Sequence, residues 1–368
     1  MQELLHQLEH HYRHPERCAQ DQNLVYFMED MPGFRRKRWG RGFRYFDPAG
    51  RPVNAHPIKE RLAKIPAPPA WRNVWLAPED NFHVLATGED EAGRRQYTYH
   101  PRWSAYRNRL KYYHLLTFAN ALAPLRKKAY QDLQTFASAQ DIQAEGLLAL
   151  MMLLLDKGAL RIGSEYYYEQ RETVGLTTLG PEHVSLDKGR IELCYPAKSG
   201  KERCIRLQNK RLSKVLTSLK AHHVSKTRLF SYLKDGEPTP ISGEQLNQYL
   251  NRQHTLDISA KDFRTWTGTL EAFKLMKKAS RSKQTLALKT VVDHVSRQLG
   301  NTPAIARQSY IHSDLIALWQ DGDFESYLPS PDERKRKAYF SKHEVELCQV
   351  LSTLFEEKMN PLFKGHSF

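Results

Sequence analysis

Five residues beyond position 160 have side chains suited to cutting a phosphodiester bond without a metal ion. They are Arg161, Lys198, Arg264, Asn301 and Tyr310. Attack on phosphorus builds negative charge on the non-bridging oxygens, and guanidinium forks match these oxygens in geometry. A tyrosine hydroxyl can act as the nucleophile, and a flexible lysine ammonium can protonate the leaving oxygen. If this protein cuts a nucleic-acid backbone, these residues are the candidates for those roles.

Each of these residues alone has an ordinary structural explanation. Arg161 can pair with Glu165 one helical turn later, and Lys198 is by default a solvated loop lysine. Arg264 can stack on a neighbouring aromatic ring, and Tyr310 is one of 18 tyrosines. The chemical interpretation therefore depends on the whole set.

Other catalytic signatures are missing from the sequence. It contains no GxxxxGK[ST] phosphate loop, no HExxH motif and no evident carboxylate cluster for two-metal chemistry. We therefore predict that the protein uses no cofactor, no metal ion and no nucleotide.

The net charge of +15 and the pI near 9.5 favour a polyanionic partner, of which nucleic acid is the commonest. The length of 368 residues suits two domains, and 40% hydrophobic with 26% charged residues is an ordinary globular composition. The most apolar stretch, Gly146 to Leu155, is too short to span a bilayer and predicts a buried helix. The polar N-terminus resembles no signal peptide, so we expect a cytoplasmic protein.

The four cysteines are widely spread and form no CxxC pair. This spacing argues against a zinc ribbon and against a disulfide scaffold. Cys194 and Cys204 could meet across a hairpin, but we expect them to be buried free thiols in a reducing cytoplasm.

The first hundred residues are rich in strand signals. In GFRYFDPAGRPV, Phe43 and Tyr45 alternate with arginines before a turn signal at Asp47 to Gly50. NFHVLATG and RRQYTYH flank the polar segment Glu89 to Gly93, which predicts another hairpin. From about Tyr106 the apolar residues follow helical spacing, interrupted by a hairpin of IELCYP and RCIRL around Gly200. Ser341 to Glu344 begins a last amphipathic helix, near residues 342–359, as a capping box.

These patterns predict an α+β protein in three parts. A small β-rich N-terminal domain covers residues 1–104, and a mainly α-helical catalytic domain covers residues 105–325. A C-terminal extension with the amphipathic helix covers residues 326–368. The first boundary lies in HPRWSAY, where the period of the apolar residues changes.

Several ordered motifs resemble one family, the type IB DNA topoisomerases, in their compact poxvirus and bacterial branch. The motifs are LRIGSEYYYEQRETVGLTTL, AKSGK, KDFRTWTGT and LGNTPAIARQSY. In the N-terminal part, GFRYFDPAGRPV, IPAPPAWRNVW and ATGEDEAGRRQYTYHPRW resemble the same bacterial proteins. The similarity covers roughly residues 30 to 320, and the steps of 37 residues from Arg161 to Lys198 and of nine from Asn301 to Tyr310 also fit this branch.

The resemblance implies a role for each of the five residues. Tyr310 attacks the scissile phosphorus, retains the 3′ phosphate and expels a 5′-hydroxyl. Arg161 and Arg264 grip the non-bridging oxygens, Lys198 is the general acid, and Asn301 donates a hydrogen bond to the phosphate. Poxvirus members have histidine at the position of Asn301, whereas bacterial relatives look like this chain. The implied activity is ATP-independent relaxation of supercoiled DNA by a nucleoid-associated monomer that clamps the duplex.

The spacing between Asn301 and Tyr310 adds a geometric requirement. On one continuous helix, residues nine apart lie about 13 Å and half a turn apart, so both could not reach one phosphate. Thr302 and Pro303 have the types of an N-cap and a first helical residue. We therefore predict that Asn301 lies in the turn before the helix, and that the helix unwinds or bends near Tyr310.

Two N-terminal segments are candidates for DNA contact. GFRRKRWGRGFRYF interleaves cations and aromatic residues, and its Arg35, Arg36 and Arg44 are candidate phosphate ligands, as is Lys201 in the hairpin. The alternative is a charged strand that packs its aromatic rings inward. In RRQYTYH, the residues Gln96, Tyr97 and Tyr99 match base-contacting positions of the poxvirus enzyme. Glutamine can read adenine, whereas alternation puts both tyrosines on one face, where core packing is the alternative.

Two other functions are compatible with parts of the sequence. A tyrosine recombinase shares the catalytic fold and the nine-residue spacing, but it often has histidine where this chain has Lys261, and most recombinases lack the β-rich N-terminal domain. A non-catalytic, basic DNA-binding protein is the second alternative. Against it, all five active-site positions hold competent residues.

Overall fold

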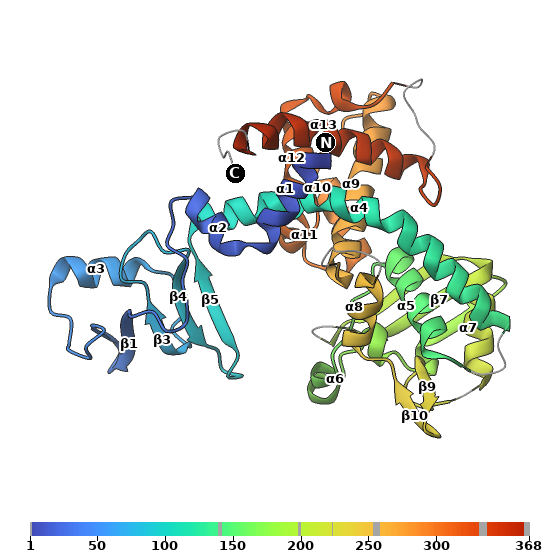
Figure 1. The fold of residues 1–368 in the computed structure, drawn as a ribbon, viewed down its shortest axis with the longest axis horizontal. Coiled ribbons are helices and arrows are strands. Elements are labelled where there is room, and N and C mark those ends of the chain that lie inside the picture. The colour runs from blue at the N-terminus through green and yellow to red at the C-terminus, as the bar shows by residue number, and fades with distance from the viewer. Residues whose placement is uncertain are drawn as a thin grey trace. The chain divides into compact units, whose positions relative to one another are not determined.

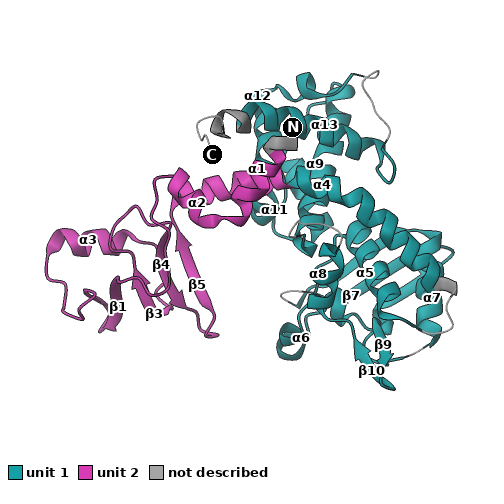
Figure 2. Ribbon diagram, viewed as in Figure 1, with its two compact units in different colours: residues 1, 115–368 teal, residues 2–114 magenta. Residues whose placement is uncertain are grey.

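The computed structural model describes residues 2–138, 142–197, 200–222, 224–252, 258–330 and 337–363. The chain divides into two compact units, one of residues 2–114 and one of residues 115–368 together with Met1 (Figures 1 and 2). The division lies inside the long helix α4 (Pro101–Ser138), whose first turn also contains the boundary expected after residue 104. None of the helices in the described ranges is long and apolar enough to cross a membrane.

The N-terminal unit contains a five-stranded antiparallel sheet. Its strands lie in the order β2 (Gly42–Phe46), β1 (Phe34–Trp39), β3 (Arg72–Leu76), β4 (Val84–Glu89) and β5 (Arg95–Tyr99). One face packs against α3 (His56–Lys64) through Leu62, which contacts the buried Val74, Leu76 and Ala86. On the other face Trp75 and Val84 form a second core with Phe27 and Phe82. The remaining helices of this unit are α1 (Gln2–Arg13) and α2 (Pro15–Asp21). The β-rich N-terminal region is therefore confirmed.

The second unit is mainly helical, as predicted, and the apolar stretch forms the buried helix α5 (Ala144–Gly158). The expected hairpin is present as β7 (Arg190–Pro196) and β8 (Glu202–Gln208), extended to three strands by β6 (Val184–Asp187). The helices are α6 (Glu165–Arg171), α7 (Lys210–His222), α8 (Gly243–Asn251), α9 (Ala260–Arg281), α10 (Leu288–Leu299), α11 (Pro303–Ser309) and α12 (Ser313–Asp321), with short 3₁₀ turns at Leu176–Thr178, Pro181–His183 and Phe324–Tyr327.

A second small hairpin, β9 (Ser231–Lys234) and β10 (Glu237–Pro240), interrupts the region that the sequence patterns described as helical. Its turn is Asp235-Gly236, and both residues have positive φ angles of 53° and 85°. Asp-Gly is a strong signal for a two-residue hairpin turn. The strands were missed because four-residue strands leave almost no periodicity to detect.

Helix α13 (Lys342–Phe363), which lies in the expected C-terminal extension, packs against α9 within the second unit. The predicted capping box is confirmed: Ser341 N donates to Glu344 Oε2 at 2.7 Å, and Glu344 N donates to Ser341 Oγ at 3.3 Å. Glu344 also accepts hydrogen bonds from Arg126 of α4 and Trp266 of α9, at 2.7 and 3.2 Å. This buried carboxylate therefore ties α13 to the helix that carries Arg264.

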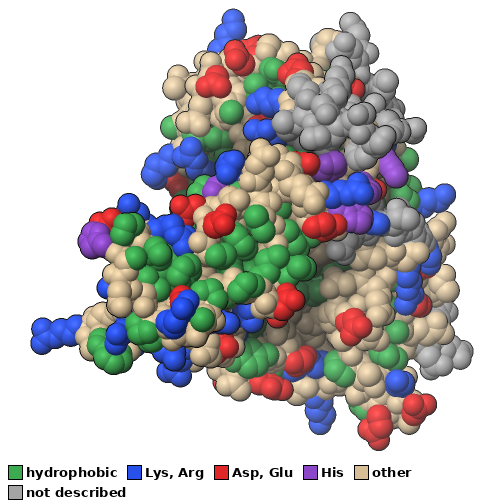
Figure 3. Space-filling model, turned by 60° about the vertical axis from the view of Figure 1, so that its left-hand side comes forward, with side chains coloured by type: hydrophobic (Ala, Val, Ile, Leu, Met, Phe, Trp, Pro, Cys, Tyr) green, Lys and Arg blue, Asp and Glu red, His purple; other side chains and the backbone are tan. Residues whose placement is uncertain are grey.

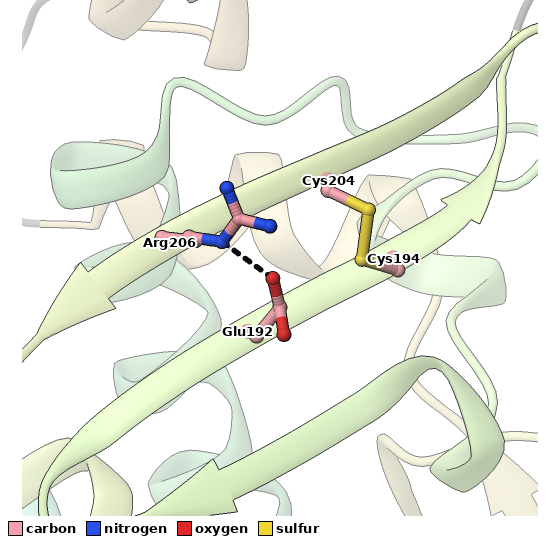
Figure 4. Close-up of a disulfide and its surroundings, with 4 residues drawn as sticks. All are labelled: Glu192, Cys194, Cys204 and Arg206. Atoms are coloured by element: carbon pink, nitrogen blue, oxygen red, sulfur yellow. Dashed lines mark hydrogen bonds and ion pairs between the residues drawn. A yellow bond between two sulfur atoms is a disulfide. The ribbon is translucent and has the colours of Figure 1, made fainter.

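The expectation of free thiols at Cys194 and Cys204 was wrong. These residues lie directly opposite each other on β7 and β8 and form a disulfide, with their Cα atoms 4.1 Å apart (Figure 4). Antiparallel register brings directly opposed residues this close, so the pairing follows from the hairpin and not from the sequence spacing. Cys18 and Cys348 are free.

Candidate active site

Arg161 is held by an extended segment directly after α5. Its carbonyl accepts a hydrogen bond from Leu176 N at 2.9 Å, and Ile162 O accepts one from Thr177 N at 2.8 Å. The two segments approach closely because a side chain on Gly175 would collide with Gly163, which itself has a φ of 97°. The motif LRIG therefore fixes the backbone from which the Arg161 side chain extends.

The Arg161 guanidinium reaches the turn between α10 and α11. Its Nη2 donates to Gly300 O at 2.8 Å and to Asn301 Oδ1 at 2.5 Å. The simpler explanation, a pair with Glu165, does not apply, because Glu165 Oε2 instead accepts from Arg228 Nη2 at 2.8 Å. Arg161 and Asn301, separated by 140 residues, are thus in direct contact.

Arg264 is buried inside the second unit, with only 3% of its surface exposed. Its Nη1 donates to Ala159 O at 2.5 Å and its Nη2 to Leu299 O at 2.9 Å, while its guanidinium lies 5.1 Å from the centre of the Tyr310 ring. Burial and the nearby Arg161 charge lower the pKa of Arg264 to about 10, against the opposing influence of Tyr310. Arg264 is therefore not the surface arginine that its aromatic neighbours in sequence suggested.

The turn geometry predicted for Asn301 and Tyr310 is confirmed. Helix α10 ends at Gly300, which adopts a φ of 60°, and Asn301 precedes the N-cap Thr302, whose side chain accepts from Ile305 N. Pro303 is the first residue of α11, and this helix ends at Ser309. Tyr310 follows as the C-cap, with φ −130° and ψ −7°, so the two candidate residues flank a short helix.

Gly268 and Thr269 of α9 position Tyr310, and sequence reasoning did not single them out. A Cβ on Gly268 would lie 2.5 Å from Tyr310 O, so only glycine permits this approach. Thr269 Oγ1 donates to Tyr310 O and accepts from His312 N, both at 3.2 Å. Gly268 lies one helical turn after Arg264, and a glycine inside a strong helix is a signal that could have identified it.

The site is arranged to receive an anion. Within the described ranges, neither Arg161 nor Arg264 forms an ion pair with a carboxylate. Two buried donors, Arg264 Nε and Asn301 Nδ2, have no hydrogen-bond partner among the described residues. Buried cations and donors are costly when they lack partners. A phosphate bound beside Tyr310 would supply the missing acceptor oxygens.

Lys198, the expected general acid, lies outside the described residues, between β7 and β8 in the sequence. Lys201 is exposed immediately before β8, and its carbonyl accepts from Ala197 N at 2.8 Å. The structure therefore brings together Arg161, Arg264, Asn301 and Tyr310 of the five candidates.

Strand register places part of the expected DNA contacts on one face of the N-terminal sheet. Directly opposed residues of neighbouring strands share a face of the sheet. One such row crosses four strands and consists of Arg35, Trp75, Thr87 and Tyr97. Tyr97 and Tyr99 are partly exposed, and their rings stack 5.9 Å apart on that face, as alternation predicted.

Arg44 also lies on this face because it is opposite Lys37, two residues from Arg35. Its guanidinium covers Trp39, whose side chain is 63% exposed. Figure 3 draws one side of the whole molecule, on which lysine and arginine side chains lie among hydrophobic ones. Arg35, Arg44 and the two exposed tyrosines therefore lie on the same face of the N-terminal sheet.

Arg36 and Gln96 lie on the other face of the sheet. Arg36 donates to Ala67 O at 2.6 Å and to Pro68 O at 2.7 Å, and burial lowers its pKa. Gln96 Nε2 donates to Asp90 Oδ2 at 2.9 Å. Both side chains are thus engaged by the protein itself.

Known proteins are similar in sequence to most of this chain. Residues 100–321 match the family described as the catalytic core of eukaryotic DNA topoisomerase I, and residues 42–90 match the N-terminal domain of bacterial DNA topoisomerase IB. The DNA topoisomerase 1B of Acanthamoeba polyphaga mimivirus is 27% identical over 308 residues, which cover 79% of this chain and 88% of the viral protein. The DNA topoisomerase 1B of Vaccinia virus (strain Copenhagen) is 23% identical over 254 residues, 66% of this chain and 74% of its own length. With a match over well more than half of its residues and this arginine-lined tyrosine, the chain belongs to the type IB DNA topoisomerases.

Proposed function

We propose that this type IB topoisomerase relaxes supercoiled DNA with Tyr310 as its nucleophile. The observation that carries the proposal is the position of the buried Arg264 guanidinium, 5.1 Å from the Tyr310 ring and within one site with Arg161 and Asn301. Negative charge develops on the tyrosine oxygen and the phosphate during attack, and these fixed donors stabilise it.

In the cleavage step, Tyr310 Oη forms a bond to the scissile phosphorus while the bond from phosphorus to the 5′ oxygen breaks. The phenol proton leaves to solvent, and Lys198 supplies a proton to the departing 5′ oxygen. Arg161, Arg264 and Asn301 donate to the non-bridging oxygens. The product is a 3′-phosphotyrosyl ester with a free 5′-hydroxyl.

Religation is the reverse reaction. The 5′-hydroxyl attacks the phosphotyrosyl ester, Tyr310 leaves, and the original phosphodiester is restored. Because the ester conserves the energy of the broken bond, the cycle requires no nucleotide hydrolysis. The arginines and Asn301 stabilise the charge that a metal ion would otherwise neutralise, so the proposed mechanism uses no metal ion. Rotation of the free end between the two steps releases torsional strain.

The N-terminal sheet supplies part of the DNA-binding surface. Arg35 and Arg44 contact phosphates from the face that also carries Tyr97 and Tyr99, whereas Gln96 reads a base once DNA displaces its bond to Asp90. Lys201 contacts the backbone from the hairpin. The protein acts as a monomer that clamps duplex DNA in the nucleoid.

A plasmid assay tests the proposal. Supercoiled plasmid is incubated with the protein in EDTA and without ATP, and the products are resolved by agarose electrophoresis. Stepwise relaxation is expected, and Tyr310→Phe is expected to abolish it while DNA binding remains. A recombinase would instead join strands at specific sites, and a non-catalytic binding protein would leave no covalent protein–DNA adduct. Absence of both relaxation and adduct overturns the proposal.

A further inference from the structure

Arg203 is a third buried arginine beside the proposed site, and the proposed chemistry assigns it no role. It is the second residue of β8, directly opposite the buried Tyr195, and 9% of its surface is exposed. Its Nη1 donates to Leu299 O, and its Nη2 donates to Gln298 O at 3.0 Å. Arg203 therefore joins the β7–β8 hairpin to the last turn of α10.

The carbonyls that Arg203 binds come immediately before Gly300 and Asn301. Leu299 O also accepts from Arg264, and Gly300 O accepts from Arg161, so three guanidinium groups bind consecutive carbonyls at one helix end. Carbonyls at a helix C-terminus lack intrahelical donors and carry partial negative charge. The last carbonyls of α10 and Gly300 thus accept hydrogen bonds from all three arginine side chains.

The fit at Gly300 depends on Arg203. A Cβ on Gly300 would lie 2.2 Å from Arg203 Nη1, and Gly300 adopts a φ of 60° that favours glycine. The guanidinium occupies the space that a side chain would need. Arg203 therefore determines the path of the backbone from α10 into the turn that carries Asn301.

Arg203 differs from Arg161 and Arg264 in what its side chain can still do. Both of its terminal nitrogens already donate to main-chain carbonyls of α10. Burial and the nearby Arg161 charge also lower its pKa, with Tyr195 opposing, and it forms no ion pair with a carboxylate in the described parts of the chain. A buried guanidinium satisfied by two carbonyls is suited to holding segments together.

We propose that Arg203 is a positioning residue that fastens the β7–β8 hairpin to the α10–α11 turn, and so sets the place of Asn301 at the scissile phosphate. The inference rests on the proposed function of Asn301. The carbonyl partners of Arg203 precede Asn301 by two and three positions in the sequence. One side chain thus connects strand β8 to the segment that carries the neutral phosphate donor.

Single-turnover cleavage of a duplex oligonucleotide, at saturating enzyme, tests this role. Arg203→Ala is expected to lower the cleavage rate constant about 100-fold, the scale of a small misplacement of reacting groups. The Kd for DNA should stay unchanged because both terminal nitrogens of Arg203 donate to carbonyls within the protein. The cleavage rate constant of Arg203→Lys should lie between those of the wild type and Arg203→Ala. An ammonium group keeps the charge but cannot bind two carbonyls as a planar guanidinium does.

Arg206→Ala is the matched control. Arg206 is on the same strand, but its side chain is 71% exposed and its Nε donates to Glu192 Oε1 at 2.5 Å (Figure 4). Removal of this arginine should leave the cleavage rate constant unchanged. A decrease equal to that of Arg203→Ala would show that any arginine of β8 matters and would overturn the inference.

A further readout separates positioning from a general loss of structure. In an Asn301→Ala background, Arg203→Ala should lower the cleavage rate constant by a much smaller factor than it does alone, because residues that act through one another are not additive. Full additivity of the two substitutions would contradict the proposal.

Failure of the proposed function is distinguishable from failure of this inference. If the wild-type protein forms no Tyr310 adduct, the proposed function fails. If the wild type forms the adduct and Arg203→Ala forms it equally fast, only the role of Arg203 fails. Should Arg203→Ala not fold, as judged by its thermal unfolding transition, Arg203→Lys carries the same comparisons.

Discussion

The guanidinium of Arg264 lies over the ring of Tyr310, 5.1 Å from its centre, although the two residues are 46 positions apart. Arg264 is the fifth residue of α9, and Tyr310 is the C-cap of α11. Leu299 O of α10 accepts from Arg264 Nη2, and Thr269 of α9 donates to Tyr310 O. Helix α9 therefore both carries the buried arginine and binds the backbone of the proposed nucleophile.

Loss of the Arg264 guanidinium should reduce the cleavage rate constant far more than it reduces the stability of the fold. Arg264→Ala is expected to lower the single-turnover cleavage rate constant about 100- to 1,000-fold, the usual effect of removing one donor from a developing oxyanion. Lys278→Ala, an exposed change on the same helix, is the control and should leave the rate constant unaltered. An Arg264→Ala protein that cleaves at the wild-type rate would remove Arg264 from the proposed site.

Gly268 should be intolerant of a side chain because Tyr310 lies against it. Gly268→Ala places a methyl group 2.5 Å from Tyr310 O, so α11 must shift and carry the nucleophile with it. We expect a decrease of about 10- to 100-fold in the cleavage rate constant. Gly243→Ala is the control, since its methyl group would lie 3.4 Å from the nearest atom, an ordinary contact. Equal rates for both variants would contradict the positional role of Gly268.

The buried Glu344 should make folding sensitive to acid. Burial by itself would raise its pKa, but hydrogen bonds and charge attraction from Arg126, together with Ser341, lower it to about 2. Because the folded pKa lies below the unfolded value, the stabilisation is complete above about pH 5 and is lost as the pH falls towards 2.

Urea unfolding measures this effect. Glu344→Gln should lower the free energy of unfolding at pH 7 by about 3 kcal/mol, because it breaks a buried pair and leaves Arg126 partly unpaired. The difference between variant and wild type should shrink between pH 5 and pH 2. A difference that is constant over this range would show that the carboxylate charge is not responsible.

The disulfide predicts how many thiols the protein carries. Titration of the unfolded, unreduced protein with a thiol reagent should detect two thiols, those of Cys18 and Cys348. Detection of four thiols would contradict the pairing. Cys194→Ser with Cys204→Ser should lower stability by about 2 to 3 kcal/mol, as expected for a short closed loop. Cys348→Ser, which touches no disulfide, serves as the comparison for the thiol count.

The two faces of the N-terminal sheet should respond differently to loss of an arginine. Arg44→Ala should weaken DNA binding and reduce the slope of log Kd against log salt by about 1, because one phosphate contact is lost. Arg36→Ala should leave that slope unchanged and lower stability instead, because Arg36 binds Ala67 O and Pro68 O. Equal slopes for Arg44→Ala and the wild type would exclude Arg44 from phosphate contact.

Local patterns were sufficient for several features of the molecule. The strands of the N-terminal unit, the buried helix α5 and the capping box at Ser341 follow from periodicity and from residue types that act over a few positions. The turn at Asn301 and the end of α11 at Tyr310 were also predictable, because Thr302 and Pro303 are strong helix-start residues. The motifs likewise identified the family.

Contacts between distant segments could be decided only by the tertiary structure. Arg203 looked like any charged strand residue, and Cys194 and Cys204 looked like ordinary thiols, until register and packing gave them partners. Gly268 became important through Tyr310, which lies 42 positions away in sequence. The sequence by itself determined which side chains are available for phosphoryl transfer and on which elements they lie. Their convergence on the carbonyls at the end of α10 depends on how the segment after α5, helix α9 and strand β8 are brought to that helix end, and no local pattern encodes such long-range packing.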